Sequence, residues 1–182
     1  MKTLLRLIKG GKPPKMKFAS FGRERDLSMI EEYVVDPELK ARYLKQTAAA
    51  HDLNEGIVTA DAFIDATREA VLQSTQTGRD APLILLARVA RYYPECLGLW
   101  DELAESQDWQ NRFTVACRLY GAVPDAVSDR LFNRLRNDRS KRVREISICR
   151  YENRANEKGE VAFGVYDSAQ FDERVRKGEV KI

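Results

Sequence analysis

One short pattern recurs in this chain at a fixed distance, and it limits the folds that the chain can adopt. Arginine, four other residues, cysteine and arginine follow one another at 112–118 and again at 144–150, a spacing of 32 residues from Arg112 to Arg144. Repeats of about 20 to 50 residues are typical of similar units that stack on one another. The pattern therefore predicts an all-α fold of stacked antiparallel helix pairs rather than a single closed core.

The composition agrees with a folded, helical chain. Apolar residues make up 43% and charged residues 32% of the 182 residues, which is typical of globular proteins. Only six prolines and ten glycines are present, so few residues interrupt helices. The net charge of +3 is too small by itself to indicate a nucleic-acid partner, so the distribution of charge carries more information.

Apolar residues at helical spacing predict helices through a domain at 26–155. Asp26 is the expected N-cap of the first helix, Asp36 that of the second and Thr59 that of the third. Gly56 is expected to end the second helix. The helices after the first are expected at 37–52, 60–76, 80–93, 94–106, 109–120, 124–137 and 141–155.

The two ends of the chain differ from this domain. Residues 1–25 form a basic arm, because Met1–Arg23 carries seven Lys or Arg residues and no Asp or Glu. The arm either contacts phosphates or another anionic surface, or is a solvated lead-in whose leucines cover the first helix. In the C-terminal tail, 156–182, apolar residues alternate over Val161–Tyr166, which predicts a short strand or an extended tail.

The stretch 131–145 resembles a HEAT repeat, because Val143 and Arg144 follow Asp138 at the five- and six-residue spacing of that family. The resemblance extends over about 60–151 and is strongest at 126–151. It implies an α-solenoid whose second helices form a concave face. It also implies that Arg112 and Arg144 bind carbonyl groups or an aspartate of a neighbouring unit.

Basic residues gather on the last predicted helices. Between Arg130 and Arg150 there are eight Lys or Arg residues against Asp138 and Glu145. Such a surface attracts an acidic partner, although a solvated face has the same composition. The residues predicted to bind the partner are Arg118, Arg130, Arg134, Arg139, Arg142 and Arg150.

The resulting hypothesis is a non-catalytic protein-binding module that docks an acidic protein on a basic concave face. An inhibitor of the immunity or antitoxin type is its concrete version. The basic surface argues against a nuclease as the target of such an inhibitor, since nuclease inhibitors tend to imitate an acidic ligand. The oligomeric state does not follow from the sequence.

The alternative hypothesis is nucleic-acid binding. Some residue types here are similar to those of the HEAT-like alkylpurine DNA glycosylases, which place aromatic side chains and an aspartate on a basic concave face. The residues of these types are Tyr92, Tyr93, Trp100, Asp101 and Trp109. Core packing of Trp100, and packing of Trp109 at the start of a helix, explain both tryptophans without nucleic acid.

No residue pattern predicts catalysis, a cofactor or a metal. The single histidine, His51, lies near a helix end, where histidines commonly interact with the helix dipole. Gly10-Gly11-Lys12 lacks the remainder of a phosphate-binding loop. Asp61, Asp65 and Glu69 share a helix face, which predicts a solvated acidic surface rather than a metal site.

The cysteines and the hydropathy bear on location. Cys96, Cys117 and Cys149 are far apart and odd in number, which predicts buried thiols in a reducing compartment. No apolar run is long enough for a transmembrane helix. The expected location is therefore cytoplasmic.

Overall fold

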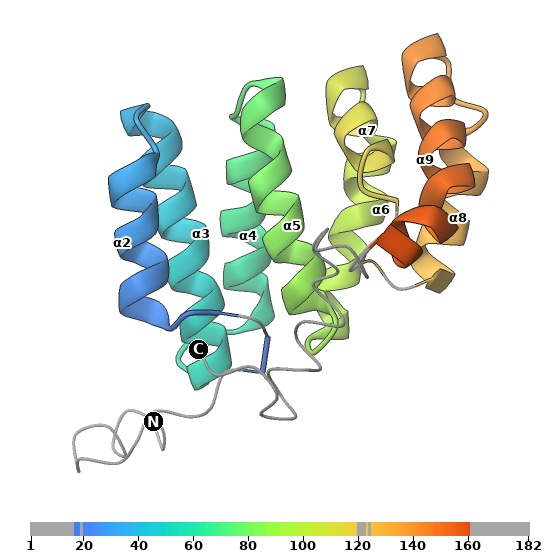
Figure 1. Cartoon of the computed structure of the whole chain (residues 1–182). Coiled ribbons are helices and arrows are strands. Elements are labelled where there is room, and N and C mark those ends of the chain that lie inside the picture. The colour runs from blue at the N-terminus through green and yellow to red at the C-terminus, as the bar shows by residue number, and fades with distance from the viewer. Residues whose placement is uncertain (1–16, 19, 120–122, 124, 161–182) are drawn as a thin grey trace.

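The computed structural model describes residues 17–18, 20–119, 123 and 125–160 (Figure 1). This part of the chain is helical and contains no strand, which confirms the predicted all-α class. The α-helices are α2 (Arg23–Tyr33), α3 (Pro37–Glu55), α4 (Ala60–Leu72), α5 (Asp80–Ala90), α6 (Gly98–Glu105), α7 (Trp109–Ala116), α8 (Asp125–Leu135) and α9 (Lys141–Glu160). Two 3-10 helices, η1 (Gln76–Arg79) and η2 (Pro94–Leu97), precede α5 and α6.

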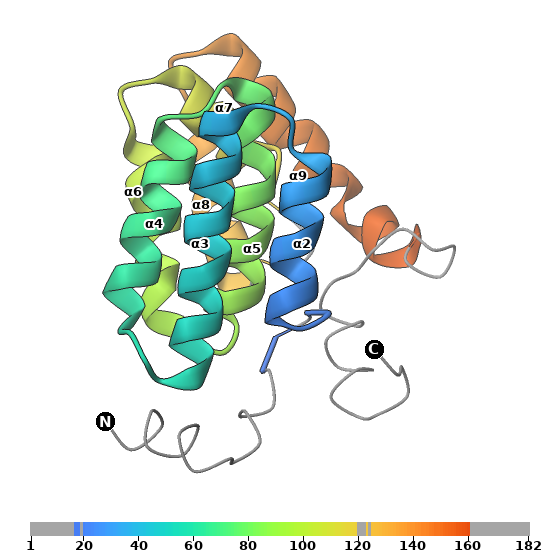
Figure 2. The same cartoon turned by 90° about the vertical axis from the view of Figure 1, so that its left-hand side faces the viewer.

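Helices that follow one another in the sequence pack side by side. Helix α2 packs on α3, α4 on α5, α6 on α7 and α8 on α9, and these pairs stand next to one another in chain order (Figure 1). Contacts of α3 with α4, of α6 with α8 and of α7 with α9 join neighbouring pairs. When the molecule is turned, α2 and α9 lie toward one side and α4 and α6 toward the other (Figure 2).

The apolar core runs through these pairs because each helix turns an apolar stripe inward. In α4 the stripe is Phe63, Ala66, Ala70 and Val71, at the spacing expected of one helix face. Trp100 of α6 is 0% exposed, which confirms its predicted place in the core. Helix α2 is the exception, since none of its residues is fully buried.

The ends of α3 follow local rules. The Asp36 side chain accepts a hydrogen bond from the Leu39 N–H at 2.9 Å, and Pro37 occupies the first helical position. Gly56 ends the helix with a φ of 71°, a left-handed conformation that favours glycine. Both ends agree with the prediction from the sequence.

Of the two other predicted caps, Asp26 is wrong, whereas Thr59 holds the predicted N-cap position of α4. Asp26 is not the N-cap of the first helix, because α2 begins at Arg23 and Asp26 lies within its first turn. Its carboxylate instead accepts bonds from the Ser20 hydroxyl, the Phe21 N–H and His51. Thr59 precedes α4 as predicted, but its side chain makes no capping hydrogen bond.

Several predicted boundaries also move. Helix α4 ends at Leu72, the helix predicted at 94–106 divides into η2 and α6, and α9 continues to Glu160. Apolar spacing does not fix such ends, which depend on local backbone hydrogen bonds. Most of the basic arm and the alternating segment Val161–Tyr166 lie outside the described residues.

Cys96 is buried, Cys117 is partly buried and Cys149 is exposed, so the prediction of three buried thiols is wrong for Cys149. Within the described residues, no helix combines the length and apolar character that a membrane crossing needs.

Candidate functional site

The six arginines predicted to bind a partner differ in what they already contact. Arg130 and Arg134 lie on α8 and reach across to α6. Arg130 forms two hydrogen bonds to the Asp101 carboxylate, at 2.9 and 2.5 Å, and Arg134 pairs with Glu105 at 2.5 Å. Carboxylates of α6 therefore neutralise both positive charges on the surface where α6 and α8 meet.

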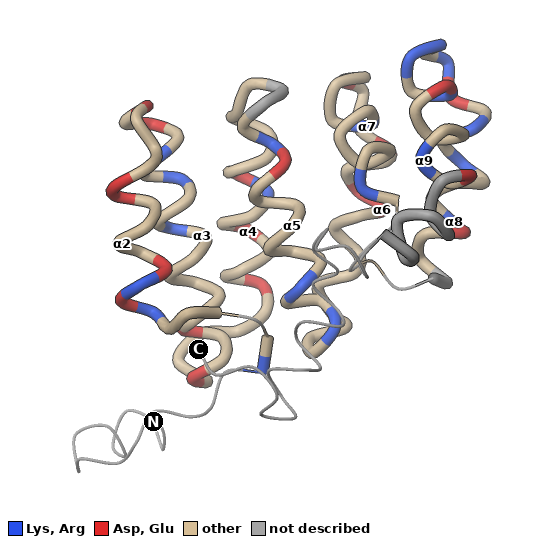
Figure 3. The backbone as a smooth tube through the Cα atoms, viewed as in Figure 1, with Lys and Arg blue, Asp and Glu red and all other residues tan. Residues whose placement is uncertain are grey.

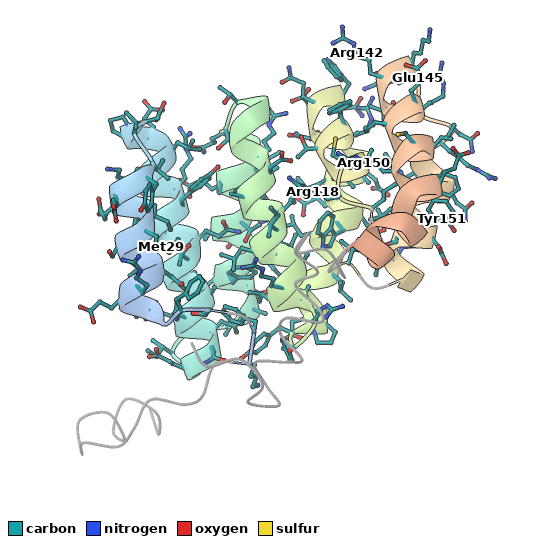
Figure 4. All side chains as sticks on the ribbon, in the orientation of Figure 1. Met29, Arg118, Arg142, Glu145, Arg150 and Tyr151 are labelled. Atoms are coloured by element: carbon teal, nitrogen blue, oxygen red, sulfur yellow. The ribbon has the colours of Figure 1, made fainter. Side chains whose placement is uncertain are left out.

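Arg118 and Arg150 belong to the other side of the array. Arg118 follows α7 and pairs with Asp80, at the start of α5, at 3.0 Å. Arg150 lies on the side of α9 toward α7 (Figure 4). Burial and Asp80 raise the pKa of the Cys117 thiol, and the charges of Arg150 and Arg118 oppose this shift. The two arginines thus act on the same local environment between α7 and α9.

Arg139 and Arg142 form a third group, at the end of the array where two loops meet. Arg139 donates to the carbonyl and to the side-chain Oε1 of Gln107, at 2.7 and 3.0 Å. The guanidinium of Arg142 lies 5.5 Å from the centre of the Trp109 ring. We call this group, with the exposed Lys141, which pairs with Glu145 at 3.6 Å, the basic edge. Basic residues gather visibly there (Figure 3), and the group lines a shallow depression.

A buried ion pair holds the loop that carries Arg139 and leads into α9, where Lys141 and Arg142 lie. Arg112 of α7 donates to both oxygens of Asp138, from Nε at 2.6 Å and from Nη2 at 3.0 Å. Arg112 also bonds the carbonyls of Ser106 and Gln107, while Arg144 bonds those of Asp138 and Arg139. Arg112 thus reaches an aspartate beyond its own helix pair, whereas the carbonyls that Arg112 and Arg144 bond lie in the loops directly before their own helices.

The same contacts set the charge of Asp138. Burial raises the pKa of its carboxyl, but the hydrogen bonds from Arg112 and from the Ser140 N–H outweigh burial. The pKa therefore lies below its ordinary value of 3.8, and the carboxylate stays ionised at neutral pH. The basic edge is thus anchored to a fixed charge pair, although it is itself at the surface.

The residues suggested for nucleic-acid binding do not gather at one open surface. Trp100 is fully buried and Asp101 pairs with Arg130. Trp109 is partly exposed and packs edge-on against Phe113, with 6.0 Å between the ring centres. Trp109 is therefore the tryptophan of this pair that lies at a possible contact surface, next to Arg142.

A second concave site, not predicted from the sequence, lies between α2 and α5 above α3. It is a pocket of about 350 Å³ with mainly apolar walls. His51 lies at its floor, 1% exposed, with Nε2 3.0 Å from the Asp26 carboxylate. His51 lies near the end of α3 as predicted, and the contact with Asp26 is one that the sequence did not predict. Ile84 and Leu85, which lie beside the apolar stripe of α5, were the signal that could have indicated the pocket.

The acidic face of α4 is solvated and paired. Asp65 pairs with Arg68 at 2.5 Å, and Glu69 pairs with Lys45 of α3. Within the described residues, no three His, Cys, Asp or Glu side chains are placed to hold a metal ion.

Comparison with models of protein families, with curated proteins and with solved structures finds no significant match to this chain.

Proposed function

We propose that this protein is a non-catalytic binding module that docks an acidic protein partner on the basic edge. The observation that carries the proposal is the difference in partners among the predicted arginines. Arg139 contacts the carbonyl and the neutral side-chain amide of Gln107, and Arg142 contacts an aromatic ring, and neither forms an ion pair with a carboxylate of the described residues. Their charges are therefore more available to an acidic partner than those of the arginines that pair with Asp or Glu.

The basic edge has a composition that suits protein binding. Arginine and tryptophan are the residues most often found where interface energy is concentrated. The two loops are already fixed by Arg112 and Arg144, so less conformational entropy is lost when a partner docks. An immunity- or antitoxin-type inhibitor remains the concrete version of the proposal.

A HEAT-like α-solenoid is the arrangement that we propose for the whole helical domain. Two observations support it: α7 and α9 are neighbours although their matching arginines are 32 residues apart, and Arg112 bridges to Asp138 in the next unit. In such an array each pair covers the apolar face of the next, and an extended surface is left for a partner.

Binding of polyglutamate, compared with mixed-sequence DNA and RNA, tests the proposal. We expect polyglutamate to bind, and the double variant Arg139→Gln, Arg142→Gln to bind it about tenfold more weakly, if each exposed charge contributes about 0.7 kcal/mol. The matched control is Arg130→Gln, Arg134→Gln, which removes the same formal charge from arginines that are already paired. Affinity should fall as salt screens the charges.

Two results would contradict the proposal. An equal loss of affinity in the control variant would show that the basic edge is not the docking site. Tighter binding of DNA or RNA than of polyglutamate, with a steep dependence on salt, would favour the nucleic-acid alternative.

A further inference from the structure

The pocket between α2 and α5 lies at the opposite end of the helix array from the basic edge (Figure 1). Its volume of about 350 Å³ falls in the range of sites that hold small molecules. Met29 and Ile30 of α2 and Ile84 and Leu85 of α5 form facing apolar walls. An inference about this pocket is therefore independent of the proposed function.

One end of the pocket is more polar than the other. The residues at each end can be assigned because α3 and α5 run in one direction and α2 runs in the other (Figure 1). Asp26 lies early in α2, whereas His51 and Arg88 lie late in α3 and α5, so these three line the same end. Ile30 and Ala81 line the other end together with Tyr43, whose hydroxyl donates to the Gly78 carbonyl. A molecule that fits both ends has a polar group and an apolar chain.

The walls of the pocket leave apolar surface uncovered. Helix α2 has no fully buried residue, and its Met29 and Ile30 remain partly exposed (Figure 4). Phe21, at the rim, is 52% exposed. Covering apolar surface of this kind is favourable in proportion to the area removed from water. An apolar chain would supply that cover.

The polar end selects an uncharged group. Asp26 is a fixed negative charge, held by Ser20, the Phe21 N–H and His51, and Arg88 supplies a positive charge. An ionised head group would lose its hydration on entering a pocket whose walls are mainly apolar, whereas a hydroxyl or amide loses less and can hydrogen-bond to the Asp26 carboxylate. Gln46, also in the lining, donates from Nε2 to Thr67 and to the Pro82 carbonyl.

We propose that this pocket binds an uncharged, mainly apolar molecule with one hydroxyl or amide group, whose chain lies between α2 and α5. The group hydrogen-bonds at the end lined by Asp26, His51 and Arg88. The chain covers Met29, Ile30, Ile84 and Leu85.

Three probes with the same chain and different head groups test this assignment: 1-octanol, octanoate and octylamine. Each is titrated into the full-length protein, and binding is followed through the methyl NMR signals of Met29, Ile30 and Ile84. We expect 1-octanol to bind most tightly and to shift these signals. Shortening the alcohol should weaken binding about fourfold per methylene group, since each buried methylene contributes about 0.8 kcal/mol.

A variant that fills the pocket completes the test. Ala81 is exposed and lines the pocket, so Ala81→Trp should lower the affinity for 1-octanol at least tenfold without unfolding the chain. Ala41→Trp, at an exposed position of α3 outside the pocket, is the matched control and should bind as the unchanged protein does. Circular dichroism verifies that both variants are folded.

Three outcomes would overturn the proposal. Absence of binding by all three probes would exclude the site. Equal or tighter binding of octanoate or octylamine would exclude an uncharged head group. Unchanged affinity in folded Ala81→Trp would place the bound molecule elsewhere.

Discussion

The ion pairs that arginine side chains form in this protein differ mainly in how deeply they are buried. The side chains of Arg112 and Asp138 are 6% and 8% exposed, whereas those of Arg130 and Asp101 are 55% and 35% exposed. Charge pairs at the surface contribute little because water and salt screen them. Removing one partner of a buried pair lowers the free energy of unfolding strongly, since the other charge then remains buried alone.

Replacing Arg112 should therefore destabilise the fold more than replacing Arg130. We expect Arg112→Met to lower the free energy of unfolding by about 3 to 5 kcal/mol. Arg130→Met, the matched control, should lower it by less than about 1 kcal/mol. Urea unfolding followed by circular dichroism measures both. Similar losses in the two variants would show that burial does not distinguish these ion pairs.

Stability should fall in acid because two aspartates are held in their ionised form. For Asp26 and Asp138, burial raises the pKa, but hydrogen bonds from His51 and Ser20, and from Arg112, outweigh it and lower the pKa below 3.8. A lowered pKa stabilises the folded state above the unfolded value, and this contribution disappears as pH falls through the folded value. The free energy of unfolding should thus decrease as pH falls below about 4.

Urea midpoints measured across this pH range test the prediction. Asp138→Asn should be less stable than the unchanged protein at neutral pH but should lose less stability on acidification. An identical pH dependence in the two proteins would show that Asp138 does not contribute to it.

At the scale of elements, α3 and α4 begin with different N-caps. Asp36→Ala should lower the free energy of unfolding by about 1 kcal/mol, because it removes the acceptor for the Leu39 N–H. Thr59→Ala is the matched control and should have a smaller effect, since the Thr59 side chain makes no capping bond. Thermal unfolding of both variants checks the difference, and equal losses would contradict it.

Helix α2 should open more easily than the helices beside it. It has no fully buried residue, whereas α4 buries five, among them Phe63 and Val71. Local opening requires less free energy where few side chains are buried. Hydrogen exchange should therefore be faster for the amides in the middle of α2 than for those of α4. Equal protection of the two helices would show that α2 is held as firmly as the core.

At the scale of the whole molecule, one core joins the helix pairs. Trp100 is fully buried in this core, at a position midway along the chain. Trp100→Ala should lower the free energy of unfolding by about 3 to 5 kcal/mol through the cavity that it leaves. Trp109→Ala removes the same side chain from a partly exposed site and should have a clearly smaller effect. Denaturant unfolding distinguishes the two, and a larger loss in Trp109→Ala would contradict the prediction.

The helices could be predicted well, and the candidate sites only in part. Periodic apolar residues indicated the α-helices of the described residues but not all of their ends, since α9 continues through 156–160, which were assigned to the tail. The spacing of Arg112 and Arg144 anticipated that α7 and α9 are neighbours. Arg139 and Arg142 of the basic edge were among the six predicted arginines. The sequence did not predict that Arg130 and Arg134 pair with carboxylates whereas Arg139 and Arg142 do not. The pocket was missed because its walls come from three helices, and the apolar residues on each resemble ordinary core positions.

The sequence by itself determined the elements: the helical class, the capped start and glycine end of α3, and the 32-residue spacing whose two arginines lie on the neighbouring helices α7 and α9. These features depend on residues within one or two helical turns, or on a regular spacing, and both are visible along the chain. Only the tertiary structure decided which charges are offset and where a pocket remains. Arg118 meets Asp80, and His51 meets Asp26, because separate helices pack at particular positions and angles. No local pattern encodes that packing, since it results from the fit of whole helix surfaces.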